Sequence, residues 1–245
     1  MKRYFLKLCY KGTLFNGFQI QQNAKTIQSE VEKALQVFYK TEINLTGSSR
    51  TDAGVHAIEN YFHFDTTLEI LQKHIYNLNA ILPDDIVLLE LKEVNNTAHC
   101  RFDALYREYK YYIYQEKNPF LKDKAFFYPY ALDFVLMQEA ANLLMLYQNF
   151  TAFSKKHTQV NNFNCAITKS HWIQENDCWV YNVQSNRFLR GMVRALVATM
   201  LKVGRGQISI EEFKNLIEQK NSASAFFDAP AHGLFLVKVE YPTTL

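Results

Sequence analysis

The chain has 245 residues, 48% of them hydrophobic, and a formal net charge of +3 at pH 7. This composition excludes a disordered chain and provides a core for one large domain or two small ones. So small a positive charge does not by itself indicate a nucleic-acid partner. We interpret the cysteines, which show no metal-ligand spacing, as reduced thiols and expect no metal. They are Cys9, Cys100, Cys165 and Cys178.

Neither the start of the chain nor its most apolar stretch is typical of a targeting or membrane segment. The apolar run after Met1 is too short for a signal peptide. Arg190, Arg194 and Lys202 interrupt the apolar stretch 189–203, which excludes a membrane span. We therefore expect a cytoplasmic protein without a membrane partner.

The first half of the chain alternates strands and helices. Charged and apolar residues alternate over 2–10, which predicts a half-buried strand. Helical spacing from Ile27 to Phe38 predicts a helix with Thr26 as its N-cap. The next expected elements are a short strand over 42–46, a strand over 56–65, a helix over 68–82 that ends at Pro83, and a strand over 86–94.

The second half repeats this alternation. We expect a strand over 107–115, a helix over 132–148 capped by Asp133, a hairpin of 165–174 and 178–186, a helix over 188–203, a helix after the capping box Ser209–Glu212, and a strand over 234–241. Alternating strands predict an α+β fold with a mostly antiparallel sheet and helices on one face. We expect two halves, 1–105 and 106–245, that share this sheet.

A run of small and polar residues from Gly47 to Ile58 contains one carboxylate, Asp52, two positions after Arg50. Arginine favours an ionised carboxylate and contacts phosphate, and Gly54 admits backbone angles that other residues resist. A tight polar turn has the same composition, because Asp, Ser, Thr and Gly are ordinary turn residues. On composition alone, the turn is the favoured interpretation.

The predicted strand 107–115 is dense in tyrosine. Its residues Arg107, Tyr109, Tyr111 and Ile113 face the same way, so a phenol lies on the same face as a cation. A cross-strand aromatic ladder with solvated charges is the alternative.

Three arginines accompany the predicted helix 188–203. Arg187, Arg190 and Arg194 are spaced by three and four, which places them on one helix face. Arg194 lies between apolar neighbours, so its charge needs a partner. We hypothesise that this partner is Asp52.

Three weaker signals each have an ordinary structural interpretation. Gly204-Arg205-Gly206 is consistent with phosphate binding, but a helix C-cap turn is favoured. The basic loop Lys155-Lys156-His157 is a solvated loop or an RNA-backbone contact. His56 and His63 are interpreted as structural histidines.

Together these motifs resemble those of the tRNA pseudouridine synthase A family over nearly the whole chain. The most specific match is Arg50-Thr51-Asp52-Ala53-Gly54-Val55-His56-Ala57, and the second is Arg107-x-Tyr109-x-Tyr111. The others are Tyr10-Lys11-Gly12 with Phe15-Asn16-Gly17-Phe18-Gln19 and Gln22, Phe188-Leu189-Arg190-x-Met192-Val193-Arg194, Val203-Gly204-Arg205-Gly206, and Ala229-Pro230-Ala231-x-Gly233-Leu234. Motifs in one expected order carry far more weight than a single motif.

The resemblance implies two RRM/ferredoxin-like halves that share a sheet, and a homodimer that binds tRNA. The implied reaction is isomerisation of uridine to pseudouridine at positions 38, 39 and 40 of the anticodon stem-loop. It moves the ribose C1′ bond from N1 to C5 of the same uracil with no redox step, so no cofactor is expected.

The resemblance also implies roles for six residues. Asp52 is a nucleophile at C1′ or a base at C2′, and these two mechanisms stay open. Arg194 orients that carboxylate and Tyr109 stacks on the detached uracil. Substrate binding is assigned to Arg50, Arg107 and Arg190, with Arg50 helping to extrude the target uridine.

The match has two departures, and other functions remain open. Ser49 stands where the family more often has glycine, and Asn60 stands where glutamine is usual, so both bear on the fit to RNA. One alternative is a pseudouridine synthase that acts on another RNA. A second is an RNA-binding protein without catalysis, and a third is an α+β domain with polar turns.

Overall fold

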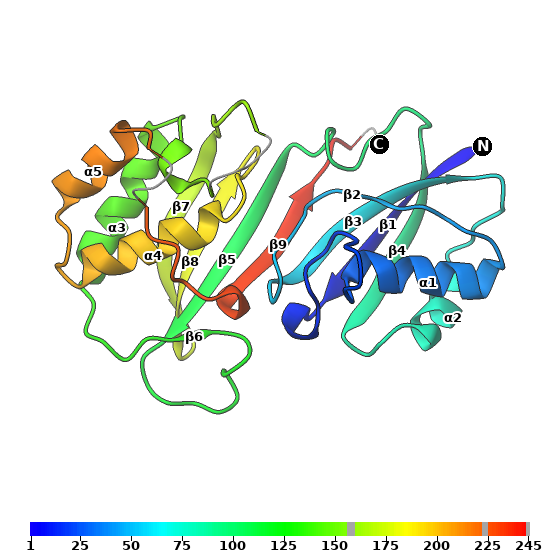
Figure 1. The fold of residues 1–245 in the computed structure, drawn as a ribbon, viewed down its shortest axis with the longest axis horizontal. Helices are drawn as coiled ribbons and strands as arrows, with labels where there is room; N and C mark the ends of the chain where they lie inside the picture. The colour runs from blue at the N-terminus through cyan, green and yellow to red at the C-terminus, as the bar shows by residue number, and fades with distance from the viewer. Residues whose placement is uncertain (156–159, 222–224, 244–245) are drawn as a thin grey trace. The chain divides into compact units, whose positions relative to one another are not determined.

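A computed structural model describes residues 1–155, 160–221 and 225–243. The chain forms two compact units, Met1–Leu105 with Phe235–Leu245, and Tyr106–Leu234 (Figure 1). Each unit combines helices with mostly antiparallel strands, as expected for a mixed α and β fold. The ferredoxin-like arrangement of two halves stays a prediction. No helix in the described part of the chain is long and apolar enough to cross a membrane.

The first unit is built around strand β1. It pairs with two antiparallel neighbours, β3 and β4. Strand β3 also pairs with β2, antiparallel over a short stretch, and with β9, in parallel. The strands are β1 (Lys2–Tyr10), β2 (Thr46–Gly47), β3 (His56–Thr66), β4 (Ile86–Val94) and β9 (Leu234–Glu240). Helices α1 (Ile27–Tyr39) and α2 (His74–Ile81) cover one face of these strands (Figure 1), and a short 3₁₀ helix, η1, spans Gly12–Leu14.

Helix α1 confirms the sequence pattern that predicts it. Its buried residues Ile27, Val31, Ala34 and Leu35 follow helical spacing and form one face toward the core. Thr26 caps the first turn, because its side chain accepts the Ser29 N–H while Ser29 Oγ accepts the Thr26 N–H.

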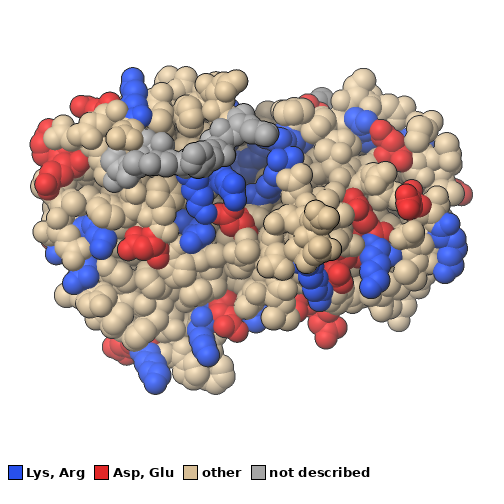
Figure 2. Space-filling view, in the orientation of Figure 1, with Lys and Arg blue, Asp and Glu red and all other residues tan. Residues whose placement is uncertain are grey.

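The second unit pairs β5 with β8 and β8 with β7 in antiparallel register, and β6 with β5 in parallel. Its strands are β5 (Tyr106–Tyr114), β6 (Phe126–Phe127), β7 (Ile167–Glu175) and β8 (Cys178–Ser185). Its helices are α3 (Phe134–Leu143), η2 (Leu144–Leu146), η3 (Thr151–Phe153), α4 (Met192–Gly204), α5 (Ile210–Glu218) and η4 (Ala231–Gly233). Acidic side chains gather over α5 (Figure 2), which carries Glu211, Glu212 and Glu218.

Several element boundaries differ from their predictions. The expected strand 42–46 is reduced to Thr46–Gly47. The helix expected over 68–82 begins only at His74, because the Leu68 and Leu71 amides donate to the Thr66 and His74 side chains. The helix expected over 132–148 ends at Leu143 and continues as the 3₁₀ turn η2.

The start of α4 is a further correction. The helix begins at Met192 rather than Phe188, because Gly191 has a left-handed backbone, with φ of +73°, that a continuous right-handed helix does not contain. Arg187 and Arg190 therefore precede α4. The prediction that they share one helix face with Arg194 is wrong.

Candidate functional site

The Asp52 loop connects β2 to β3 in the first unit. Residues 52–55 form a turn in which the Val55 N–H donates to the Asp52 carbonyl over 3.2 Å, and Gly54 has φ of +80°. Asp52 is half-buried and Arg50 is exposed, whereas their neighbour Thr51 is buried. The predicted tight turn is therefore present, and it carries Asp52 two positions after Arg50.

A buried polar network holds this loop against the sheet. Asn60 is fully buried, and its Nδ2 donates to the Ser49 carbonyl over 2.8 Å and to the Tyr10 hydroxyl over 3.1 Å. The Tyr10 hydroxyl also lies 2.8 Å from Thr51 Oγ1. The two departures from the family pattern, Ser49 and Asn60, therefore contact each other and support the residues next to Asp52.

Residues 11–22, which we call the opening loop, pack closely against the Asp52 loop. The Phe18 N–H donates to the Thr51 carbonyl over 3.1 Å, and the Phe18 ring stacks on Phe62 at 4.5 Å. A Cβ on Gly12 would lie 2.0 Å from the Val55 carbonyl oxygen, so only glycine fits there. The Gly12 N–H donates to His56 Nδ1 over 3.0 Å, which supports the structural interpretation of His56.

In the second unit, β5 presents the predicted face. Arg107, Tyr109, Tyr111 and Ile113 are all buried, and they alternate with half-buried residues. Tyr109 contacts Phe188 edge to face, with ring centroids 5.1 Å apart. Arg107 Nη1 donates to the Asn186 carbonyl over 3.1 Å, so this arginine also ties β5 to the segment that leads toward α4.

The 229–234 motif anchors two of the side chains in this unit. Arg194, in the first turn of α4, donates from Nε to the Ala229 carbonyl over 2.7 Å. The Tyr111 hydroxyl donates to the Pro230 carbonyl over 2.8 Å, and burial raises its pKa above the ordinary phenol value. A Cβ on Gly233 would lie 2.8 Å from Tyr111 Cζ, so the glycine permits this close packing.

The weaker sequence signals have the following outcomes. Gly206 donates to the Val203 carbonyl over 2.8 Å with φ of +67°, which confirms the C-cap turn. In the basic loop, the Lys155 N–H donates to the Arg190 carbonyl over 3.2 Å. Lys156 and His157 lie outside the described residues.

The six predicted site residues are divided between the units. Asp52 and Arg50 belong to the first unit, and Tyr109, Arg107, Arg190 and Arg194 belong to the second. The contacts of each site residue are therefore described only within its own unit. The pairing of Asp52 with Arg194 stays a prediction.

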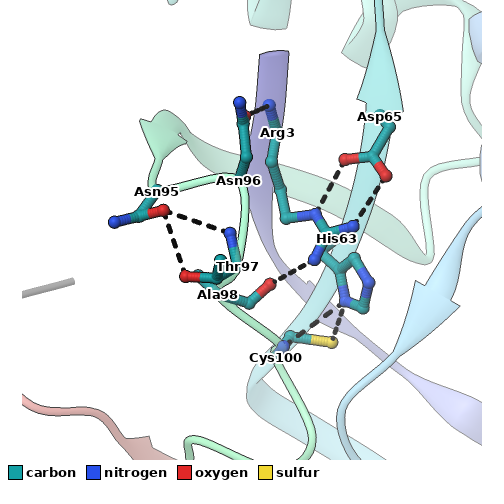
Figure 3. A network of polar contacts seen from close by, with 8 residues as sticks. All are labelled: Arg3, His63, Asp65, Asn95, Asn96, Thr97, Ala98 and Cys100. Carbon is teal, nitrogen blue, oxygen red and sulfur yellow. Dashed lines mark hydrogen bonds and ion pairs between the residues drawn. The ribbon is translucent and has the colours of Figure 1, made fainter. Parts of the chain in front are cut away.

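Among the described residues, His63, His99 and Cys100 have ligand-type atoms within 4.8 Å of one another. Each already makes a hydrogen bond to a backbone group. His63 Nδ1 accepts the Cys100 N–H over 3.3 Å (Figure 3), His99 Nδ1 accepts the Arg101 N–H over 3.1 Å, and the Cys100 thiol donates to the Thr46 carbonyl. We therefore interpret the cluster as a structural network.

Comparison with known proteins first defines the class. A family model described as tRNA pseudouridine synthase matches residues 140–242. The tRNA pseudouridine synthase A of Parabacteroides distasonis is 45% identical over 100% of this chain and 98% of its own length. The enzyme of the same name from Bacteroides fragilis is 46% identical over 99% of this chain and 97% of its own length.

A third relative, less similar in sequence, has the same name. The tRNA pseudouridine synthase A of Staphylococcus aureus is 39% identical over 97% of this chain and 91% of its own length. The chain belongs to the tRNA pseudouridine synthase A family. Pseudouridine synthases are isomerases, which makes this chain an isomerase of the RNA-modifying class.

Proposed function

We propose that this protein isomerises uridine to pseudouridine at positions 38, 39 and 40 of the tRNA anticodon stem-loop, with Asp52 as the carboxylate that acts on the substrate. The observation that carries the proposal is the Asp52 turn itself. A half-buried carboxylate stands beside an exposed arginine, in a loop held by a buried hydrogen-bond network. Catalytic groups need such fixed positions, because charge stabilisation depends on preorganised geometry.

The proposed chemistry uses the chain's own side chains. Asp52 either attacks ribose C1′ or removes the C2′ proton, and in both cases the bond from C1′ to N1 breaks. The uracil turns and C5 bonds to C1′. In the first route this step breaks the ester bond between Asp52 and C1′, and in the second the proton that Asp52 took returns to C2′. In both routes C5 then loses a proton and N1 gains one. Tyr109 stacks on the detached base, and Arg194 orients the carboxylate.

The substrate and the assembly are part of the same proposal. The names of the relatives specify tRNA, and the target base has to leave its stack to reach Asp52, a movement that we assign in part to Arg50. Arg107 and Arg190 are proposed to contact the tRNA. We propose a cytoplasmic homodimer, and we propose that the two halves of each chain share one sheet, as the family resemblance implies.

The test compares wild-type protein with Asp52→Asn on unmodified tRNA that carries uridine at positions 38 to 40. Pseudouridine is mapped by carbodiimide-dependent stops of reverse transcription. We expect wild-type stops at these positions, and a rate at least about 1000-fold lower for Asp52→Asn, as for other essential catalytic groups. Asp84→Asn, at an exposed aspartate of the same unit, is the matched control and keeps full activity.

Three outcomes would contradict parts of this proposal. Wild-type stops at other uridines would move the target and keep the chemistry. Full activity of Asp52→Asn would remove Asp52 from the mechanism. Binding of tRNA without any isomerisation would favour the alternative of an RNA-binding protein.

A further inference from the structure

A pocket of about 250 Å³ opens in the first unit beside the Asp52 loop. Its lining includes Gln19 from the opening loop, Arg50 from the Asp52 loop, and His99, Arg101 and Phe102 from the turn that follows β4. We call it the Arg50 pocket. None of the described residues that line it is acidic.

The turn 95–103, which forms one wall of the Arg50 pocket, is tied to the sheet by several hydrogen bonds (Figure 3). The Arg3 Nη1 donates to the Ala98 carbonyl over 2.8 Å, while Nε and Nη2 of the same side chain bind Asp65 over 2.7 and 2.6 Å. The fully buried Cys100 donates its N–H to His63 on β3 over 3.3 Å. The turn is therefore fixed before any ligand arrives.

This fixed turn presents an aromatic ring to solvent. Phe102 is 72% exposed, and burial of its ring therefore contributes little to folding. His99 packs against the ring at 4.2 Å, and the Arg101 guanidinium lies 5.6 Å from its centroid. An exposed ring and a cation on a rigid turn are typical of a site that stacks a flat ligand and neutralises an anion.

We propose that the Arg50 pocket binds one nucleotide of the tRNA substrate that flanks the target uridine, with its base on Phe102 and its phosphate on Arg50 and Arg101. The proposal rests on the proposed function and names a second contact of the same substrate. Arg50 lies two residues before Asp52, so a nucleotide held here is a near neighbour of the base at the carboxylate. Every base has a π-face, so this contact grips the RNA without reading its sequence.

The charge of the pocket supports this choice of ligand. Burial lowers the pKa of His99, so its ring is neutral at pH 7 and the positive charge comes from Arg50 and Arg101. The described lining contains two arginines and no acidic residue, and this composition favours a phosphate over a neutral ligand. A single-stranded or extruded nucleotide supplies both the phosphate and the free base face.

The experiment measures kinetics with tRNA for Phe102→Ala and Arg101→Gln. The matched controls are Tyr76→Ala and Lys33→Gln, which alter exposed residues of the same unit outside the pocket. We expect each pocket variant to raise KM for tRNA about 10-fold, as for loss of one base stack or phosphate contact, with little change in kcat. Arg101→Gln also lowers the slope of log affinity against log salt by about 0.7 to 0.9, and Phe102→Ala leaves this slope unchanged.

A scan with abasic nucleotides places the contact on the RNA. Wild-type protein is expected to lose affinity when one nucleotide next to the target is made abasic, and Phe102→Ala is expected to show no further loss at that position. Two results would overturn this inference: the same abasic profile for wild-type protein and Phe102→Ala, or KM values for the pocket variants that equal those of the controls. In either case, an active wild-type enzyme would still support the proposed function. A wild-type protein that does not bind tRNA would overturn both.

Discussion

The Tyr10 hydroxyl joins β1 to the Asp52 loop, and its removal separates catalytic positioning from stability. Tyr10→Phe removes the contacts of this hydroxyl with Thr51 Oγ1 and Asn60 Nδ2. Tyr39→Phe removes a hydroxyl contact with His74 Nδ1, away from the loop. Each deletion is expected to lower the free energy of unfolding by about 1 kcal/mol. Only Tyr10→Phe is expected to lower kcat, by a few fold, because only it loosens the loop that carries Asp52. Equal kcat values for the two variants in steady-state assays would contradict this role.

His63 makes the stability of the first unit depend on pH. Burial, with smaller effects of His99 and Arg3, lowers the pKa of His63 from its ordinary 6.5 to about 4. Between these values the unfolded chain binds a proton that the folded chain does not. The stabilisation is therefore complete above pH 6.5 and is lost as the pH falls toward 4, by about 2 to 3 kcal/mol in total.

Urea denaturation at pH 7 and at pH 4.5 measures this loss. His63→Gln keeps a hydrogen-bond acceptor near the Cys100 N–H but does not titrate, so we expect its stability to change less between the two pH values. If the free energy of unfolding of the wild-type protein and of His63→Gln changed equally between the two pH values, groups other than His63 would cause the pH dependence.

At the scale of elements, α1 and α5 both begin with a capping box, but α1 also binds the opening loop. Thr26 begins α1, whose first amides also bind the opening loop, because Ile27 and Gln28 donate to the Gly17 and Phe18 carbonyls. Ser209 begins α5 and exchanges hydrogen bonds with Glu212. Replacing either cap by alanine is expected to cost about 1 kcal/mol of stability.

Activity distinguishes these two variants. Thr26→Ala is expected to lower kcat because the opening loop packs on the Asp52 loop, whereas Ser209→Ala is expected to leave kcat unchanged at a temperature where both are folded. Thermal unfolding and initial rates on tRNA check both statements. A loss of activity in Ser209→Ala equal to that in Thr26→Ala would count against a specific link between α1 and the site.

Periodicity in the sequence predicts the elements that follow a hydrophobic pattern and misses the boundaries that backbone angles and side-chain hydrogen bonds set. Helix α1, its N-cap Thr26 and the Ser209–Glu212 capping box follow from spacing and cap residues alone. The late start of α4 follows from a left-handed backbone at Gly191, which no hydrophobic pattern reveals. The helix expected over 68–82 is shortened because the neighbouring Thr66 and His74 side chains take its first amides.

The same difference applies to the candidate site. The Asp52 loop is recognisable because its residues are contiguous, and the β5 face because strand alternation is local. The turn 95–103 has no periodic pattern, and its supports, Arg3 and His63, lie far away in the sequence. The only local signals were an aromatic residue beside an arginine, Arg101-Phe102, and a histidine two positions earlier.

At the scale of the whole molecule, the C-terminal segment returns to the unit in which the chain begins. Residues 235–245 belong to the first unit, although the residues just before them belong to the second. Leu236 on β9 is fully buried and pairs with Ala57 on β3. Leu236→Ala is expected to lower stability by about 2 to 5 kcal/mol, as for other buried leucines.

Hydrogen exchange read by mass spectrometry locates this loss. In Leu236→Ala, amides of β1 and β3 are expected to exchange faster, because β9 is paired with β3, while the β7–β8 hairpin of the second unit keeps its protection. Val180→Ala, at a fully buried valine of β8, is the matched variant and should give the opposite pattern. If Leu236→Ala instead exposed the β7–β8 hairpin first, the C-terminal strand would be stabilising the unit that precedes it in sequence, and the division of the chain into these two units would be wrong.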